Sequence, residues 1–148
     1  MGAGFFTGEP TGDPAGVPCD PDCWSVESKR SYAYHYTPRP YRDLAYNCWR
    51  CQALAVFTAQ DQKYTFEVRK AHISQQRVLC EACYLEWVEL VRESNEYRKR
   101  WLAERSVLMH NQEFLQRWLI VLQSMPRYNG VYDEANINMI QRLVQEEG

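Results

Sequence analysis

Apolar residues recur at spacings of three and four in the C-terminal part of the chain, and turn-forming residues separate three such runs. The first run contains Tyr84, Trp87, Val88, Val91, Tyr97, Trp101 and Leu102, the second extends from Phe114 to Met125, and the third begins at Asp133. This period is typical of amphipathic helices. Ser94-Asn95 interrupts the first run, and Pro126 with Tyr128-Asn129-Gly130 ends the second in a turn. The pattern predicts three helices with short loops in a small antiparallel bundle over residues 85–148.

The N-terminal part has no such period. Residues 1–31 are rich in Gly, Pro and acids, which predicts an extended or disordered acidic tail. From Tyr32 to Tyr46 the chain is aromatic and basic, and two prolines predict an extended path without a helix. Thr58 with Asp61 three residues later is typical of a helix start, so we expect a helix from about Ala59 to Arg69.

Length and composition limit the class of protein. The chain has 148 residues, of which 45% are hydrophobic, 14% aromatic and 24% charged, which predicts a soluble globular protein of one ordinary domain with appendages. The uncharged apolar stretch from Trp118 to Met125 is too short to span a bilayer, so we expect no membrane association. The N-terminus lacks a secretion signal, which predicts a cytoplasmic protein.

Two Cys-x2-Cys pairs carry the clearest chemical signal. Cys48-Trp-Arg-Cys51 and Cys80-Glu-Ala-Cys83 are separated by 28 residues. In a reducing compartment such spacing favours metal binding over disulfides. Each pair can place two sulfurs at adjacent corners of a tetrahedron, which predicts one structural Zn²⁺ held by Cys48, Cys51, Cys80 and Cys83. Iron also suits four sulfurs and stays an alternative.

A four-sulfur site is coordinatively full, so the metal would stabilise the fold and leave no position for water or substrate. The sequence also lacks a phosphate-binding Gly-rich loop, a nucleophile elbow and a His-Glu-x-x-His helix. We therefore expect no enzymatic activity and no small-molecule substrate. The alternative is an enzyme whose active site is formed by residues far apart in the sequence, because such a site leaves no local motif.

Residues around the two pairs resemble a known family. The similar segments are Tyr36-Thr-Pro-Arg-Pro-Tyr41, Cys48-Trp-Arg-Cys51, Phe57-Thr-Ala-Gln-Asp-Gln-Lys63, Phe66-Glu-Val68 and Arg77-Val-Leu-Cys80 with Cys83. Over about residues 33–84 the chain resembles the probable zinc-ribbon family of small bacterial proteins, which implies zinc binding. Gln52 stands where that family often has Gly, and Glu81, Ala82 and Tyr84 stand where it often has bases. The loss of bases weighs against binding of a polyanion.

Other possible ligands are weaker. Cys19 and Cys23, with His35, offer an incomplete second site, and we interpret both cysteines as free thiols. His72 lies between the two pairs, and we expect it at the surface because four cysteines already complete a tetrahedron.

The aromatic and basic run holds candidate partner-binding residues, namely Tyr34, Tyr36, Arg39, Tyr41, Arg42, Trp49 and Arg50. Such residues suit a protein interface, stacking on single-stranded nucleic acid, or packing within the chain. Residues 1–28 carry a net charge of −5, residues 29–83 carry +5 and residues 84–148 carry −2. The central positive charge favours a nucleic-acid partner only weakly.

Together these observations predict an α+β, mostly helical fold. A small four-cysteine zinc ribbon over residues 32–84 would follow the tail at 1–31, and the bundle over 85–148 would pack on the ribbon. The predicted function is a non-enzymatic binding module whose partner is another protein, as an adaptor or as an immunity-like inhibitor. A nucleic-acid-binding zinc ribbon is the alternative.

Overall fold

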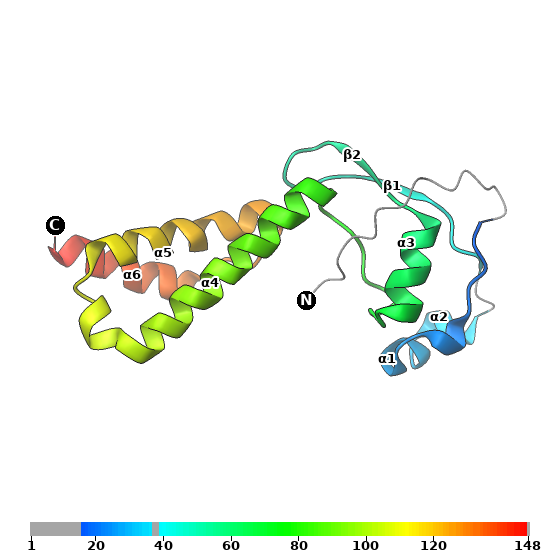
Figure 1. Cartoon of the computed structure of the whole chain (residues 1–148), viewed down its shortest axis with the longest axis horizontal. Coiled ribbons are helices and arrows are strands. Elements are labelled where there is room, and N and C mark those ends of the chain that lie inside the picture. Colours follow the sequence, from blue (N-terminus) through cyan, green and yellow to red (C-terminus); the bar gives the residue numbers. More distant parts are fainter. Residues whose placement is uncertain (1–15, 37–38, 148) are drawn as a thin grey trace. The chain divides into compact units, whose positions relative to one another are not determined.

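A computed structural model describes residues 16–36 and 39–147 (Figure 1). The described chain divides into two compact units. The first unit comprises the described residues up to Cys48 together with Ala53–Cys80. The second, which we call the helical unit, comprises Trp49–Gln52 and the chain from Glu81 onward.

The first unit is built on a β-hairpin and a helix. Strands β1 (Leu44–Asn47) and β2 (Leu54–Phe57) pair antiparallel, with Leu44 opposite Phe57. Helix α3 (Ala59–Lys63) follows and continues as a π-helical turn, η2 (Tyr64–Val68). The side chain of Thr58 accepts a hydrogen bond from the backbone N–H of Asp61 at 3.0 Å, which satisfies one of the unpaired donors of the first helical turn. The predicted helix and its cap are thus confirmed.

An aromatic core holds this unit together. The buried residues are Trp24, Tyr41, Phe57, Ala59 and Phe66. The indole N–H of Trp24 donates to the hydroxyl of Tyr41 at 2.9 Å, and the ring of Tyr41 stacks on Phe66 with centroids 6.2 Å apart. Tyr41 therefore uses both its ring and its hydroxyl inside the fold.

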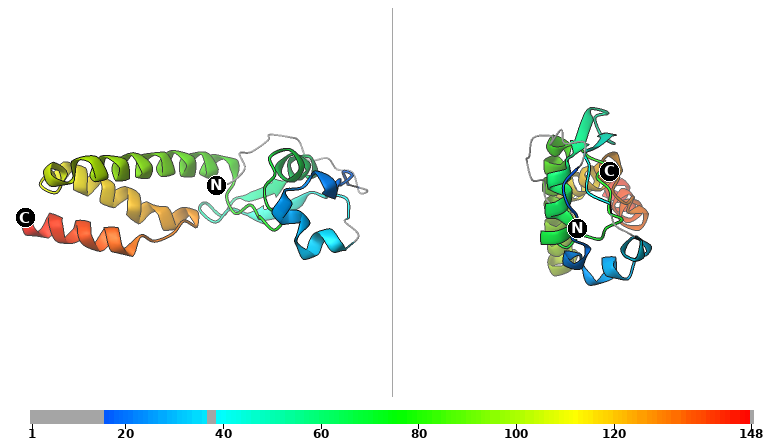
Figure 2. Two further views of the ribbon diagram at one scale, coloured as in Figure 1. Left: turned by 90° about the horizontal axis from the view of Figure 1, so that it is seen from below. Right: turned by 90° about the vertical axis from the view of Figure 1, so that its right-hand side faces the viewer.

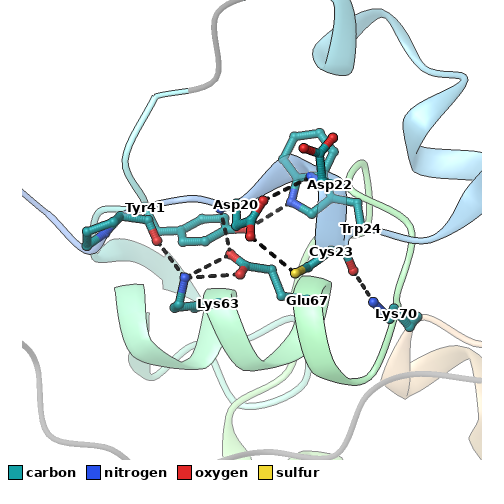
Figure 3. Close-up of polar contacts among 9 residues, drawn as sticks. Asp20, Asp22, Cys23, Trp24, Tyr41, Lys63, Glu67 and Lys70 are labelled. Atoms are coloured by element: carbon teal, nitrogen blue, oxygen red, sulfur yellow. Dashed lines mark hydrogen bonds and ion pairs between the residues drawn. The ribbon is translucent and has the colours of Figure 1, made fainter.

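The segment 17–28, here called the N-terminal strap, lies against α3 and η2 (Figure 3). The Lys63 ammonium donates to the carbonyl of Pro18 at 2.8 Å. The Glu67 carboxylate, which also pairs with Lys63 at 3.0 Å, accepts from the backbone N–H of Asp20 at 3.2 Å. These bonds tie the strap to side chains that come much later in the sequence.

The strap differs from the tail expected at residues 1–31, of which residues 1–15 lie outside the described residues. The described part contains a short 3₁₀ helix, η1 (Pro21–Cys23), and a helical turn, α1 (Val26–Lys29). A further turn, α2 (Tyr32–His35), begins the stretch that we expected to contain no helix. The turn is possible because both prolines of that stretch, Pro38 and Pro40, come after it. The strap is ordered because Trp24 buries its ring in the core.

The helical unit contains three longer helices, in agreement with the periodic runs. They are α4 (Glu81–Leu108), α5 (Gln112–Ser124) and α6 (Glu134–Glu147), with a 3₁₀ turn, η3 (Met125–Tyr128), after α5. Helix α5 lies between α4 and α6 (Figure 2). Their apolar faces form one core around Trp118, which is 1% exposed. The predicted α+β, mostly helical fold class is confirmed.

One detail of α4 differs from its sequence pattern. Ser94-Asn95 interrupts the apolar stripe, yet the helix passes through both residues. Ser94 is buried, so at the interruption of the apolar stripe a small polar side chain points into the core.

Among the described residues, none of the helices combines the length and hydropathy that a bilayer crossing needs.

Candidate metal centre

The first cysteine pair lies in the connection between β1 and β2. The backbone N–H of Cys48 donates to the carbonyl of Ala53 at 2.9 Å, which closes the loop that we call the knuckle, residues 48–53. Within it Gln52 has a φ of 67°, a left-handed conformation that glycine adopts most easily. The amide of Gln52 donates to the carbonyl of Trp49 at 3.2 Å. Glycine would adopt this conformation with less strain than Gln52 does.

The second pair lies at the start of α4. Cys80 immediately precedes the helix, and Cys83 lies in its first turn. The N-terminal end of a helix carries partial positive charge, which favours thiolate sulfur there. The hydroxyl of Tyr46 in β1 donates to the carbonyl of Leu79 at 2.8 Å. This hydrogen bond joins the segment that precedes Cys48 to the segment that precedes Cys80.

The four sulfurs form one cluster, as the sequence predicts. The Sγ atoms of Cys48, Cys51, Cys80 and Cys83 all lie within 4.8 Å of one another. A tetrahedral zinc site with Zn–S bonds of about 2.3 Å requires sulfurs about 3.8 Å apart, so the donor set fits one Zn²⁺. Cys48 and Cys83 are buried, Cys80 is half-buried and Cys51 is exposed. Bound zinc would crosslink the two pairs through these four sulfurs.

Within the described part of the chain, Cys19 and Cys23 do not join a second group of ligands. Among the residues that the structure describes, the Cys48 quartet is the group of His, Cys, Asp and Glu side chains close enough to hold an ion. The Cys23 thiol donates to the Asp20 carboxylate at 3.3 Å, and this bond raises the pKa of Cys23 (Figure 3). Burial raises the pKa of Cys19. His35 is exposed in α2. These positions agree with the interpretation of Cys19 and Cys23 as thiols.

We predict that Cys19→Ser and Cys23→Ser leave the zinc content at about one ion per chain. Burial raises the pKa of Cys19 and the hydrogen bond to Asp20 raises the pKa of Cys23, so both thiols lose their protons less readily than an ordinary cysteine, whereas a metal ligand must be a thiolate. For the same reason their alkylation by iodoacetamide at neutral pH should be slower than that of an ordinary cysteine, and it should accelerate as the pH rises. Elemental analysis and mass spectrometry measure both effects. Two zinc ions in the unaltered protein, falling to one in either variant, would establish a second site.

His72 is exposed, as expected, and its Nδ1 lies 2.7 Å from the hydroxyl of Ser74. It takes no part in the sulfur cluster.

The structure divides the candidate partner-binding residues between the two units. Tyr34, Tyr36, Arg39, Tyr41 and Arg42 lie in the first unit, and Trp49 and Arg50 lie in the helical unit. Tyr41 is 7% exposed and belongs to the core, so its assignment to a partner surface is corrected to packing within the chain. Tyr34 is half-buried, with its hydroxyl donating to Asp22 at 2.9 Å. Tyr36, Arg39 and Arg42 are exposed.

Trp49 and Arg50 are exposed at the tip of the knuckle and meet residues that sequence reasoning missed. The indole N–H of Trp49 donates to the carbonyl of Pro126 at 3.3 Å. The guanidinium of Arg50 lies over the ring of Tyr128, 5.5 Å from its centroid. Pro126 and Tyr128 belong to η3, which the sequence marks only as a turn, so no local signal points to this contact.

Comparison with known proteins supports the assignment of the metal centre. Residues 42–86 match the model of a family described as a probable treble clef domain. No curated protein and no solved structure matches the chain. The match and the sulfur cluster together confirm the resemblance to a four-cysteine zinc domain over residues 42–86 and support a zinc-binding treble clef module, whose four sulfurs are consistent with one structural zinc ion.

Proposed function

We propose that the treble clef module serves as a non-enzymatic binding module and that its partner is another protein, in an adaptor or inhibitor role. The observation that carries the proposal is the uncovered apolar face of the hairpin. Side chains of paired residues share one face of a sheet. One face carries Tyr46 and the buried Phe57, and the opposite face carries Ala45 and Val56 with Asn47 and Leu54.

All four residues of the second face are exposed, and Leu54 is 73% exposed. The pairing of β1 with β2 leaves each strand with one edge unpaired in the described sheet. An apolar strand face beside unpaired strand edges is a surface that other proteins bind. This supports a protein partner for the first unit.

The donor set supports a structural role for the zinc. Four thiolates fill a tetrahedral shell, so the ion has no exchangeable position for water or substrate. The chemistry that the ion supplies is the crosslinking of four sulfurs, and the protein residues would provide recognition.

The charges of the helical unit favour protein over nucleic acid. Several surface arginines of this unit face carboxylates, in the pairs Arg92–Glu89, Arg98–Asp133, Arg100–Glu104 and Arg117–Glu113. Binding of a nucleic acid requires a stripe of cations that follow the phosphates. Carboxylates beside these arginines reduce the positive potential that such a stripe would need.

The function is tested by capture from the native cell with the full-length, zinc-loaded protein, after nuclease treatment. We expect one specific protein, which then binds in purified form with a fixed stoichiometry and with little change between low and moderate salt. The variant Leu54→Asp should weaken this binding, whereas Val131→Asp, at a position of the helical unit that is even more exposed, should not. The proposal would be overturned if the partner were captured only without nuclease treatment. Turnover of a metabolite by the purified protein would also overturn it.

A further inference from the structure

The helical unit has a hollow beside the tip of the knuckle. Trp49, Arg50, Gln52 and Arg127 line it, and we call these residues the knuckle patch. All four are exposed, and Trp49 is 54% exposed. The patch joins the knuckle to η3, two segments that are far apart in the sequence.

Contacts beneath the patch hold its side chains in place. Trp49 donates its indole N–H to Pro126, and Gln52 donates its amide to the carbonyl of Trp49. Arg50 lies over the ring of Tyr128, whose hydroxyl donates to Glu86 in α4 at 2.9 Å. Side chains that are already held in place lose less conformational entropy when a ligand binds. The patch is therefore organised in advance for recognition.

The turn that presents Arg127 is also closely packed. Asn129 ends η3 with a φ of 64°, and a Cβ atom added to Gly130 would lie 2.5 Å from the ring of Trp87. The ring of Trp87 also packs against Tyr128, with centroids 6.2 Å apart. The position of Arg127 is thus determined by the packing of η3 on α4.

The two guanidinium groups of the patch differ from four other arginines of this unit, Arg92, Arg98, Arg100 and Arg117, which face carboxylates. Among the described residues, neither Arg50 nor Arg127 has a carboxylate within ion-pair distance, whereas Arg92 and Arg117 each have one. Guanidinium groups bind carboxylates through paired N–H donors, and an exposed indole provides an apolar surface beside them. The patch therefore complements a carboxylate next to an apolar side chain.

We propose that the knuckle patch binds an acidic segment of the partner protein, with a carboxylate at Arg50 and Arg127 and an adjacent apolar side chain on Trp49. This inference rests on the proposed function and specifies the chemistry of the partner. A few carboxylates suffice, because the patch offers two cations, whereas Arg92, Arg98, Arg100 and Arg117 of the same unit are already paired with acids.

The test uses the full-length, zinc-loaded protein and a fluorescein-labelled synthetic peptide in which Glu alternates with Leu. A matched peptide with Gln in place of Glu is the control ligand. In fluorescence anisotropy we expect the Glu peptide to bind at least about tenfold more tightly than the Gln peptide, because charge-assisted hydrogen bonds are lost with the carboxylates. Arg127→Ala should weaken binding of the Glu peptide about tenfold, and Arg127→Lys should weaken it less.

Arg117→Ala is the matched control variant, because Arg117 is an exposed arginine of the same unit that already pairs with Glu113 at 3.0 Å. It should bind the Glu peptide as the unaltered protein does. Zinc content and circular dichroism of each variant verify that the fold is retained. Equal binding of the two peptides, or equal effects of Arg127→Ala and Arg117→Ala, would overturn the inference.

A single-stranded RNA oligonucleotide forms the last arm of the test. Displacement of the peptide by RNA, with affinity that falls steeply with salt, would assign the patch to phosphate and overturn the inference. If the captured partner binds Arg127→Ala and the unaltered protein equally, the inference fails while the proposed function stands. If no protein partner is captured at all, the proposed function fails.

Discussion

Cys48→Ser is expected to abolish zinc binding and to unfold the hairpin and α3. Cys48 is buried, so neither water nor the serine hydroxyl replaces its thiolate well in the coordination shell. Structural zinc contributes on the order of 10–16 kcal/mol in comparable small domains, and this energy is largely the folding energy of the domain. Elemental analysis should fall from about one zinc per chain to near zero, and the dispersed amide signals of the first unit should collapse.

Cys51→Ser is the matched comparison. Cys51 is exposed, so water can complete the coordination shell when its sulfur is lost. We expect this variant to keep zinc at least about tenfold more tightly than Cys48→Ser in competition with a chelator. Retention of a full zinc equivalent and native melting by Cys48→Ser would contradict the assignment of the metal centre. Elemental analysis also distinguishes zinc from iron.

Trp118→Ala is expected to destabilise the helical unit by about 3–5 kcal/mol, because it leaves a large cavity in a closely packed core. Trp118 is 1% exposed, and its ring lies 5.5 Å from that of Trp101 and 5.8 Å from that of Phe114. This loss is a large part of the roughly 5–15 kcal/mol that stabilises a typical domain. Denaturation by guanidinium chloride, followed by helical circular dichroism, measures the effect.

Two further variants show whether the cavity causes the effect. The indole N–H of Trp118 is buried and has no hydrogen-bond partner among the described residues. Trp118→Phe keeps an aromatic ring and removes this donor, so we expect a smaller loss than for alanine. Leu102→Ala, at a position 78% exposed, should change stability by less than about 0.5 kcal/mol. Equal losses for Trp118→Ala and Leu102→Ala would contradict this account of the core.

Local signals in the sequence predict those parts of the fold that depend on neighbouring residues. Thr58 begins a helix because its side chain reaches an N–H three residues later, and that geometry is contained in the spacing. The cysteine pairs are equally local, since the spacing within each pair suits two adjacent corners of a tetrahedron. The prediction that the two cysteine pairs lie together follows if a single ion binds both pairs.

Contacts between distant residues were not predictable in this way. The acidic, Gly-rich and Pro-rich composition of the N-terminal part predicts a tail, whereas one buried ring, that of Trp24, anchors the described strap in the core. Tyr41 is buried in the same core, although its place in the aromatic and basic run made it a candidate for a partner-binding surface. Arg50 and Arg127 both line the knuckle patch. The residues next to each of them in the sequence do not indicate that the two lie close together.

The N-terminal strap has a consequence for the order in which the chain folds. Its bonds to Lys63, Glu67 and Lys70 join residues 45 to 47 positions apart, whereas the turns of α4, α5 and α6 need only close neighbours. Closing a long loop costs conformational entropy before the contacts between its ends can stabilise the fold, so pairings between distant residues form late. During synthesis the strap leaves the ribosome well before α3 and η2 do, so Trp24 can meet Tyr41 but lacks its core neighbours Phe57 and Phe66 until later residues emerge. The strap is therefore made before α3 and η2 but reaches its final place only after they are present.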